Sequence, residues 1–126
     1  QYAVVTSIES IIPAGLGRSR MIANKEDLNT ANFTTKRTDG TKSDMGTVKR
    51  EDIKIDNFEE TKLLNFFSIS GINFQNIASN DAMISAKLNE MAAAGWELAF
   101  VTAGVESDSG TTDGEGIFVT RYIFKR

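Results

Sequence analysis

A glycine-rich turn followed by two arginines is the first feature of this 126-residue chain that could do chemistry. In the segment PAGLGRSR, Gly15 and Gly17 come shortly before Arg18, and Arg20 follows two residues after Arg18. Loop amides and guanidinium groups together can hold a phosphate, a sulfate or a carboxylate. The segment lacks the ending of a phosphate-binding P-loop and the spacing of a dinucleotide site. A small-anion site is therefore one hypothesis, and a turn whose arginines cover a sheet edge is the favoured interpretation.

An acidic segment near the end of the chain, ESDSGTTDGEG, is the second candidate. Glu106, Asp108, Asp113 and Glu115 supply carboxylate oxygens of the kind that bind Ca²⁺. Their spacing is not that of an EF-hand loop, and the flanking segments are typical of strands rather than helices. We favour a solvated hairpin loop with weak Ca²⁺ binding at most, and we expect no resident metal or cofactor.

The chain contains no cysteine and no histidine, which excludes several kinds of site within it. No disulfide, thiolate nucleophile or cysteine-ligated metal site can form from its own residues. Ser–His–Asp and Cys–His catalysis are excluded as well. Carboxylate, lysine, tyrosine and Ser–Lys chemistry stay open. The enzymatic alternative is a hydrolase that uses two carboxylates held roughly 5–9 Å apart.

Charge and hydropathy argue against nucleic acid and against a membrane span. The formal net charge of -3 gives no general attraction to nucleic acid or to an anionic membrane. The locally basic stretch at 36–50 has only Phe33 nearby to stack on a base, so a solvated hairpin is favoured there. No apolar run approaches the roughly 20 residues that cross a bilayer. Gln1 in place of methionine suggests a removed signal peptide or a designed truncation, and we favour export to the periplasm or beyond.

The clearest element is a helix predicted over about 81–94, followed by a sharp corner. Its apolar stripe has helical spacing, and a polar side chain just before it should cap its first turn. Gly95 stands where a helix end requires the left-handed conformation. Trp96 should then begin a strand in which Trp96, Leu98 and Phe100 share one face and pack on the helix, burying an indole of roughly 200 Å². The stripe is Ile84, Leu88 and Met91, and the candidate caps are Ser79, Asn80 and Asp81.

The remaining segments predict strands and loops. Alternation over 1–10, with apolar residues on both faces, predicts a strand inside a sheet. The polar segment 24–50 predicts a hairpin or excursion, and 52–56 predicts a short strand. Residues 57–67 suit a helix or a strand, and the helix is slightly favoured.

Two further segments complete the prediction. The segment 68–77 should be a hydrophobic loop whose Ile72, Phe74 and Ile77 tuck under the helix. Residues 117–125 should form a last strand that returns as a hairpin with the strand after Trp96. Its apolar residues on both faces indicate an interior strand or an oligomer contact.

The corner and the C-terminal strand together resemble a small bacterial family of unknown function. The residues that carry the resemblance are the helix end, GWELAFV after it, and the closing YIFKR. The longer segments SIIPAGLGRSRMI, FFSISGINFQNI and GVESDSG resemble the exported form of this family from Bacteroidetes-type bacteria. The resemblance implies a small α+β fold and export, and it implies no catalytic residues.

These observations lead to one expected fold and a ranked set of functions. We expect a single α+β domain over 1–126, with an antiparallel sheet of about four strands packed against the 81–94 helix. The favoured function is a non-enzymatic binding or interaction module of the bacterial envelope, which binds another protein or a second copy of itself. A small-ligand or anion-binding protein using Arg18 and Arg20 is the alternative, and a carboxylate-based hydrolase is the second alternative.

Overall fold

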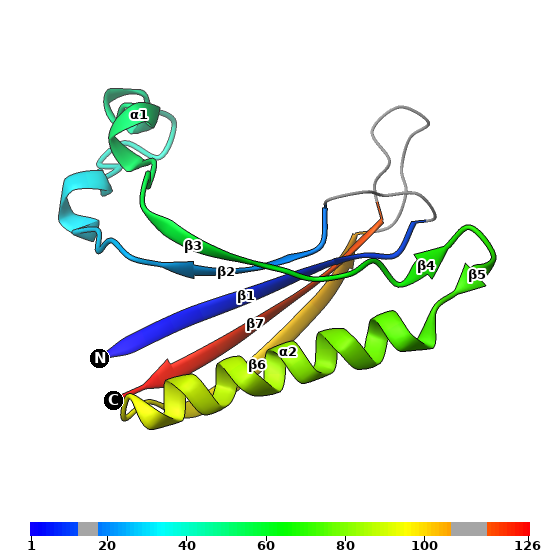
Figure 1. Cartoon of the computed structure of the whole chain (residues 1–126). Coiled ribbons are helices and arrows are strands. Elements are labelled where there is room, and N and C mark those ends of the chain that lie inside the picture. The colour runs from blue at the N-terminus through cyan, green and yellow to red at the C-terminus, as the bar shows by residue number, and fades with distance from the viewer. Residues whose placement is uncertain (13–17, 107–115) are drawn as a thin grey trace. The chain divides into compact units, whose positions relative to one another are not determined.

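The computed structural model describes residues 1–12, 18–106 and 116–126, which form two compact units. The first unit joins Gln1–Ala23 to Glu59–Arg126, and the second unit is Asn24–Phe58. The first unit holds the main sheet and the long helix (Figure 1). The α+β class is therefore confirmed.

Five strands form the main sheet, one more than the sequence predicted, in the order β3-β2-β1-β7-β6. β1 pairs antiparallel with both β2 and β7, and β6 pairs antiparallel with β7. The central place of β1 confirms that a strand with apolar residues on both faces lies inside the sheet. The strands are β1 (Tyr2–Ser10), β2 (Arg20–Asn24), β3 (Phe58–Lys62), β6 (Glu97–Glu106) and β7 (Ile117–Lys125).

The long helix α2 (Phe74–Ala93) begins about two turns earlier than predicted. Its N-cap is Asn73, whose side-chain oxygen accepts a hydrogen bond from the amide of Asn76 at 3.0 Å. The predicted caps at 79–81 were wrong because the short run of polar residues there lies within the helix. The predicted stripe is confirmed: its members pack against a core of four buried residues. The stripe is Ile84, Leu88 and Met91, and the core is Val5, Met21, Leu63 and Phe124.

The helix ends in the corner that the sequence predicted. Gly95 has a positive φ of 89°, and its amide donates to the carbonyl of Ala92 at 3.0 Å. The amide of Trp96 donates to the carbonyl of Met91, also at 3.0 Å. These two bonds are those of a Schellman motif, in which the residue after the glycine contacts the last helical turn. Trp96 accordingly packs against the core beside Met91.

One part of the corner prediction was wrong. Leu98 is paired with Phe124, but Phe100 is paired with Ile123, so the ladder contains an extra residue between them. Such a β-bulge reverses the face on which the following side chains lie. Phe100 therefore points away from α2, and both it and Leu98 are exposed.

The segments before α2 differ from their predictions in three places. The favoured helix at 57–67 was wrong: the strand β3 (Phe58–Lys62) forms there instead, and Leu63, directly after it, lies in the core. The predicted strand at 52–56 overlaps the short helix α1 (Arg50–Ile53) and has no strand. The loop before α2 is a small hairpin of β4 (Phe67–Ser68) and β5 (Gly71–Ile72), in which Ile72 is exposed, as is Phe74 at the start of α2.

The second unit is not the hairpin that Asp39-Gly40 suggested. It contains two 3₁₀ helices, η1 (Thr30–Phe33) and η2 (Met45–Thr47), besides α1, and no strand lies between 25 and 57. Asp39 does make a tight turn: its carboxylate accepts from the amide of Thr41 at 3.0 Å, which lowers its pKa. The ends of this unit are joined by Glu26, whose carboxylate accepts from the amides of Asp56 and Asn57. Among the described residues, no helix combines the length and apolar character that a bilayer crossing requires.

Candidate functional site

The register of the sheet separates its side chains into a face that α2 covers and a second face, which we call the open face. On β1, the covered face carries Ala3, Val5, Ser7 and Glu9, and α2 packs against it through the core. Within the first unit, α2 is the only described helix. The open face consists of Tyr2, Val4, Thr6, Ile8 and Ser10 of β1, Ile117, Val119, Arg121, Ile123 and Lys125 of β7, and Phe100, Thr102, Gly104 and Glu106 of β6, with Arg20 and Ile22 of β2.

The open face is partly exposed, and it carries apolar side chains together with the charged side chains of Arg20, Glu106, Arg121 and Lys125. Tyr2 is 72% exposed, Phe100 is 64% exposed and Val4 is 40% exposed. The aliphatic side chains between them on β1 and β7 are half-buried by their neighbours within the sheet. Single exposed apolar residues are ordinary, but a contiguous apolar sheet face is the kind of surface that another protein covers. The open face is therefore a candidate binding surface.

The edge strand β6 borders the open face and is exposed on both of its sides. Val101 and Val105 lie on the side of α2 by register, yet they are 51% and 57% exposed. Between Glu97 and Glu106 the strand carries no charged residue. Charged side chains, proline and short length are the usual protection of a sheet edge. β6 has ten residues, and its bulge lies between Leu98 and Phe100. The seven residues from Phe100 to Glu106 therefore form a regular free edge.

A hollow of ≈ 530 Å³ is lined by residues of β6 and β7, and Gly104 is one of them. Gly104 leaves it open because it has no side chain, and an added Cβ there would meet no atom within 4 Å. Arg121 and Val119 of β7 form its inner wall, and Glu106 stands at its end. The hollow can accept an apolar or aromatic side chain beside the Arg121 guanidinium. The complete lining is Thr102, Ala103, Gly104, Val105, Glu106, Val119 and Arg121.

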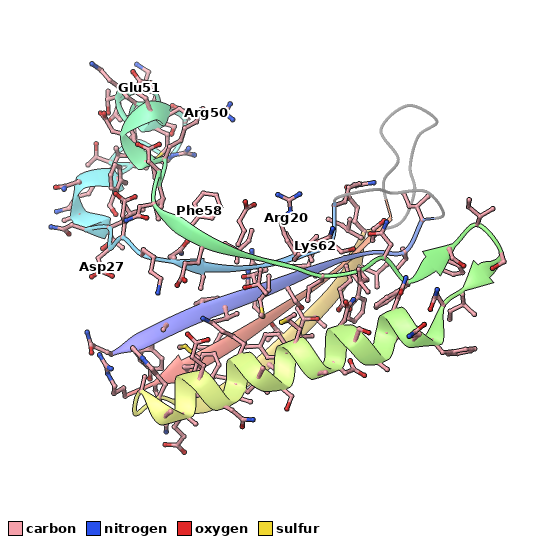
Figure 2. The ribbon with its side chains drawn as sticks, in the orientation of Figure 1. Arg20, Asp27, Arg50, Glu51, Phe58 and Lys62 are labelled. Carbon is pink, nitrogen blue, oxygen red and sulfur yellow. The ribbon has the colours of Figure 1, made fainter. Side chains whose placement is uncertain are left out.

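The predicted anion site is only partly described. Arg20 lies on β2 and its guanidinium binds the Glu60 carboxylate of β3 at 2.7 Å, while Gly15 and Gly17 lie outside the described residues. Figure 2 shows Arg20 and Lys62 on neighbouring strands. Both line a hollow of ≈ 340 Å³ together with Glu60. Arg18 comes just before β2 and is half-buried. The Glu60 carboxylate offsets one of the two positive charges in this hollow, which weakens it as a site for an anion.

Of the predicted acidic loop, the structure describes only the two ends, Glu106 and Gly116. Asp108, Asp113 and Glu115 lie outside the described residues, and Glu106 is the last residue of β6. Within the described part of the chain, no group of three or more acidic residues lies close enough to hold a metal ion. Each of the two hollows above is lined by one carboxylate, Glu106 or Glu60, and neither has the pair that glycoside hydrolysis requires.

Beneath α2 lies a polar cluster that sequence reasoning did not find. Asn80 is 1% exposed, and its side-chain nitrogen donates to the Glu9 carboxylate at 2.9 Å and to the Leu64 carbonyl at 2.7 Å. Its side-chain oxygen accepts from the Leu64 amide at 2.8 Å. Burial raises the pKa of Glu9; the Asn80 hydrogen bond opposes this rise and the charge of Asp81 adds to it. The cluster is closed by the helix, so it joins α2 to the sheet and offers no room for a substrate.

Contacts among Arg126, Trp96 and the end of α2 close the corner after this helix. The Arg126 guanidinium lies over the Trp96 ring at 4.2 Å from its centroid, a cation–π contact, and donates to the Ala94 carbonyl at the helix end at 3.2 Å. Trp96 therefore contacts two parts of its own chain, the end of α2 and Arg126. The structural role predicted for Gly95 and Trp96 is thus supported by contacts on each side of the indole.

Comparison with known proteins adds no identity to these findings. No protein-family model matches the chain, and no curated protein or solved structure matches it either.

Proposed function

We propose that this chain is a non-enzymatic binding module of the bacterial envelope that binds another protein through the open face. The observation that carries the proposal is the open face itself, which no described element of the first unit covers. The envelope location is supported by the resemblance to exported Bacteroidetes-type proteins.

The size of the open face suits a binding role. β1 and β7 have nine residues each and β6 has ten. At about 3.3 Å per residue and about 4.8 Å between strands, these three strands present roughly 30 Å by 14 Å, or about 400 Å². Covering this face with a partner removes apolar side chains from water, which is the favourable term in most protein association.

Neither alternative function receives comparable support. For anion binding, the ion pair between Arg20 and Glu60 must be broken or the anion must approach a carboxylate. For a carboxylate-based hydrolase, two acids must share a hollow, and neither hollow described above contains two.

A capture experiment tests the proposal. The natural chain is immobilised and exposed to detergent-solubilised envelope proteins from a Bacteroidetes-type bacterium, and the captured partner is quantified. We expect a Tyr2→Ser/Phe100→Ser double variant to lose most of the capture, because both exposed rings lie on the open face. The matched control is Ile72→Ser/Phe74→Ser, which removes two exposed apolar side chains away from this face and should capture as the natural chain does.

Folding is checked by urea melts of every variant. Equal capture by the natural chain and the open-face variant would contradict the proposal, and so would the absence of any captured protein. Thermal-shift measurements with phosphate and sulfate test the anion alternative, because a ligand of the native state raises the melting temperature. A shift that disappears in Arg20→Ala would favour the alternative.

A further inference from the structure

We propose that the free edge of β6 pairs antiparallel with β6 of a second copy of this chain, centred on Ala103. In this pairing Phe100 of each copy covers Gly104 of the other. The inference goes beyond the proposed function, because it assigns a second copy of the chain to the β6 edge and does not depend on another protein at the open face.

The position of β6 makes it the strand that can add a neighbour. It is an edge of the main sheet, its ten residues are almost all exposed, and its outer backbone groups have no strand beside them among the described residues. An unpaired edge presents amide and carbonyl groups that match those of another extended strand. A second copy offers an edge of the same length and composition, and a two-fold axis satisfies both edges at once.

The bulge selects the register of the pairing. From Phe100 to Glu106 the ladder with β7 is regular, so this is the part that can continue into another sheet. Centring it on Ala103 places Ala103 opposite Ala103, Thr102 opposite Gly104 and Phe100 opposite Glu106 of the second copy. Centring on the whole strand would instead place Glu97 opposite Glu106, and like charges directly opposite each other are destabilising.

The hollow at Gly104 explains how the side chains fit. Phe100 and Gly104 lie on the same face of the sheet, and Phe100 is 64% exposed. In the proposed register Phe100 of one copy is diagonal to Gly104 of the other, within reach of an aromatic side chain. An aromatic ring over a strand glycine is a known stabilising arrangement. Arg121, which lines the hollow, can then lie against the ring as a cation.

The proposed interface between the two copies is small, so the experiment must detect weak association. Seven paired residues extend about 24 Å, and such an edge buries less than the roughly 800 Å² per partner of a standard stable interface. The absence of cysteine makes disulfide trapping specific, because an introduced thiol is the only one in the chain. Opposite residues of an antiparallel pair have Cα atoms about 4.5–5.5 Å apart, within the range that a disulfide bridges.

The experiment compares Ala103→Cys with Ser85→Cys, an exposed position on α2. Under mild oxidation at micromolar concentration we expect Ala103→Cys to form a covalent dimer at least about tenfold faster, because pairing holds the thiols at a high effective concentration. Equal rates would overturn the pairing. Adding Gly104→Leu to Ala103→Cys should remove most of the rate difference, because the new side chain fills the hollow without meeting an atom of its own chain at Cβ. The matched control is Gly46→Leu, which is equally free of contacts and should leave the rate unchanged.

The outcomes separate this inference from the proposed function. If Ala103→Cys shows no excess rate but the open-face variant loses envelope capture, the pairing is wrong and the binding function stands. If cross-linking is fast and no envelope protein is captured, the pairing stands and heterologous binding is wrong. Unchanged cross-linking in the Gly104→Leu variant would overturn the proposed fit of Phe100 over Gly104.

Discussion

Replacing Asn80 by alanine should destabilise the first unit strongly, although Asn80 touches no part of the proposed binding surface. The side chain is almost fully buried and makes three hydrogen bonds, two to the backbone of Leu64 and one to Glu9. Alanine removes all three and leaves the Glu9 carboxylate beneath α2 without this donor. α2 and the segment after β3 then lose the polar link that joins them to β1.

The size of the effect follows from the kinds of bond that are lost. Each bond to the half-exposed Leu64 backbone contributes about 1 kcal/mol, and a bond to a charged group contributes about 1.5–3 kcal/mol. The expected loss is therefore about 4 kcal/mol at neutral pH, a large part of the roughly 5–15 kcal/mol that stabilises a typical domain. At acidic pH the loss should be smaller, because a protonated Glu9 depends less on the Asn80 donor.

Urea unfolding at pH 7 and at pH 4, followed by Trp96 fluorescence, measures both effects. The matched control is Asn89→Ala, the same change on the same helix at an exposed position, which should alter stability by no more than about 0.7 kcal/mol. If Asn80→Ala unfolds within about 1 kcal/mol of the natural chain, the hydrogen bonds contribute far less than their burial indicates and the reasoning fails.

Three further changes test the corner and the buried carboxyl. Gly95→Val should cost about 1–3 kcal/mol, because a β-branched residue is strained at a φ of 89°; a urea midpoint equal to that of the natural chain would contradict this. Trp96→Ala should cost about 2–3 kcal/mol, below the range for a fully buried aromatic residue because Trp96 is only half-buried, and calorimetry can measure it. Glu9→Gln should change the pH dependence of stability, because burial raises the pKa of Glu9 in the folded chain. The contribution of Glu9 to the free energy of unfolding is complete below about pH 4.5, and it is lost as the pH rises through the folded pKa. The natural chain should thus lose stability relative to Glu9→Gln over this rise, and parallel pH profiles for the two would refute the assignment.

Local sequence patterns predicted those elements whose stability comes from near neighbours in the chain. The stripe of α2, the glycine at its end and the alternation of β1 each depend on spacing within about ten residues, and all three are confirmed. The start of α2 was missed because Asn73 and Asn80 are the same residue type with opposite roles, one a cap and the other a buried partner of Glu9. Only contacts across the fold distinguish them.

The sequence predicted an apolar binding surface, but it did not indicate which residues form it. Apolar residues on both faces of the last strand indicated an interior strand or an oligomer contact; β7 is an interior strand, and its Ile117, Val119 and Ile123 lie on the open face. The bulge after Leu98 could not be found from alternation, because it changes the face of Phe100 without any change in composition. A single glycine in an apolar strand is a weak signal for a hollow, so the sequence did not indicate one at Gly104.

The corner shows why two distant parts of the sequence belong together. The structure joins the GWEL segment and the closing FKR residue by residue. Arg126 stacks on Trp96 and caps the helix end, Lys125 is paired with Glu97, and Phe124 is paired with Leu98. Phe124 is also the most buried member of the core. These residues consequently close one helix–sheet corner, so their role is in folding. A surface that differs in function, such as the open face and the edge of β6, can change without disturbing that corner.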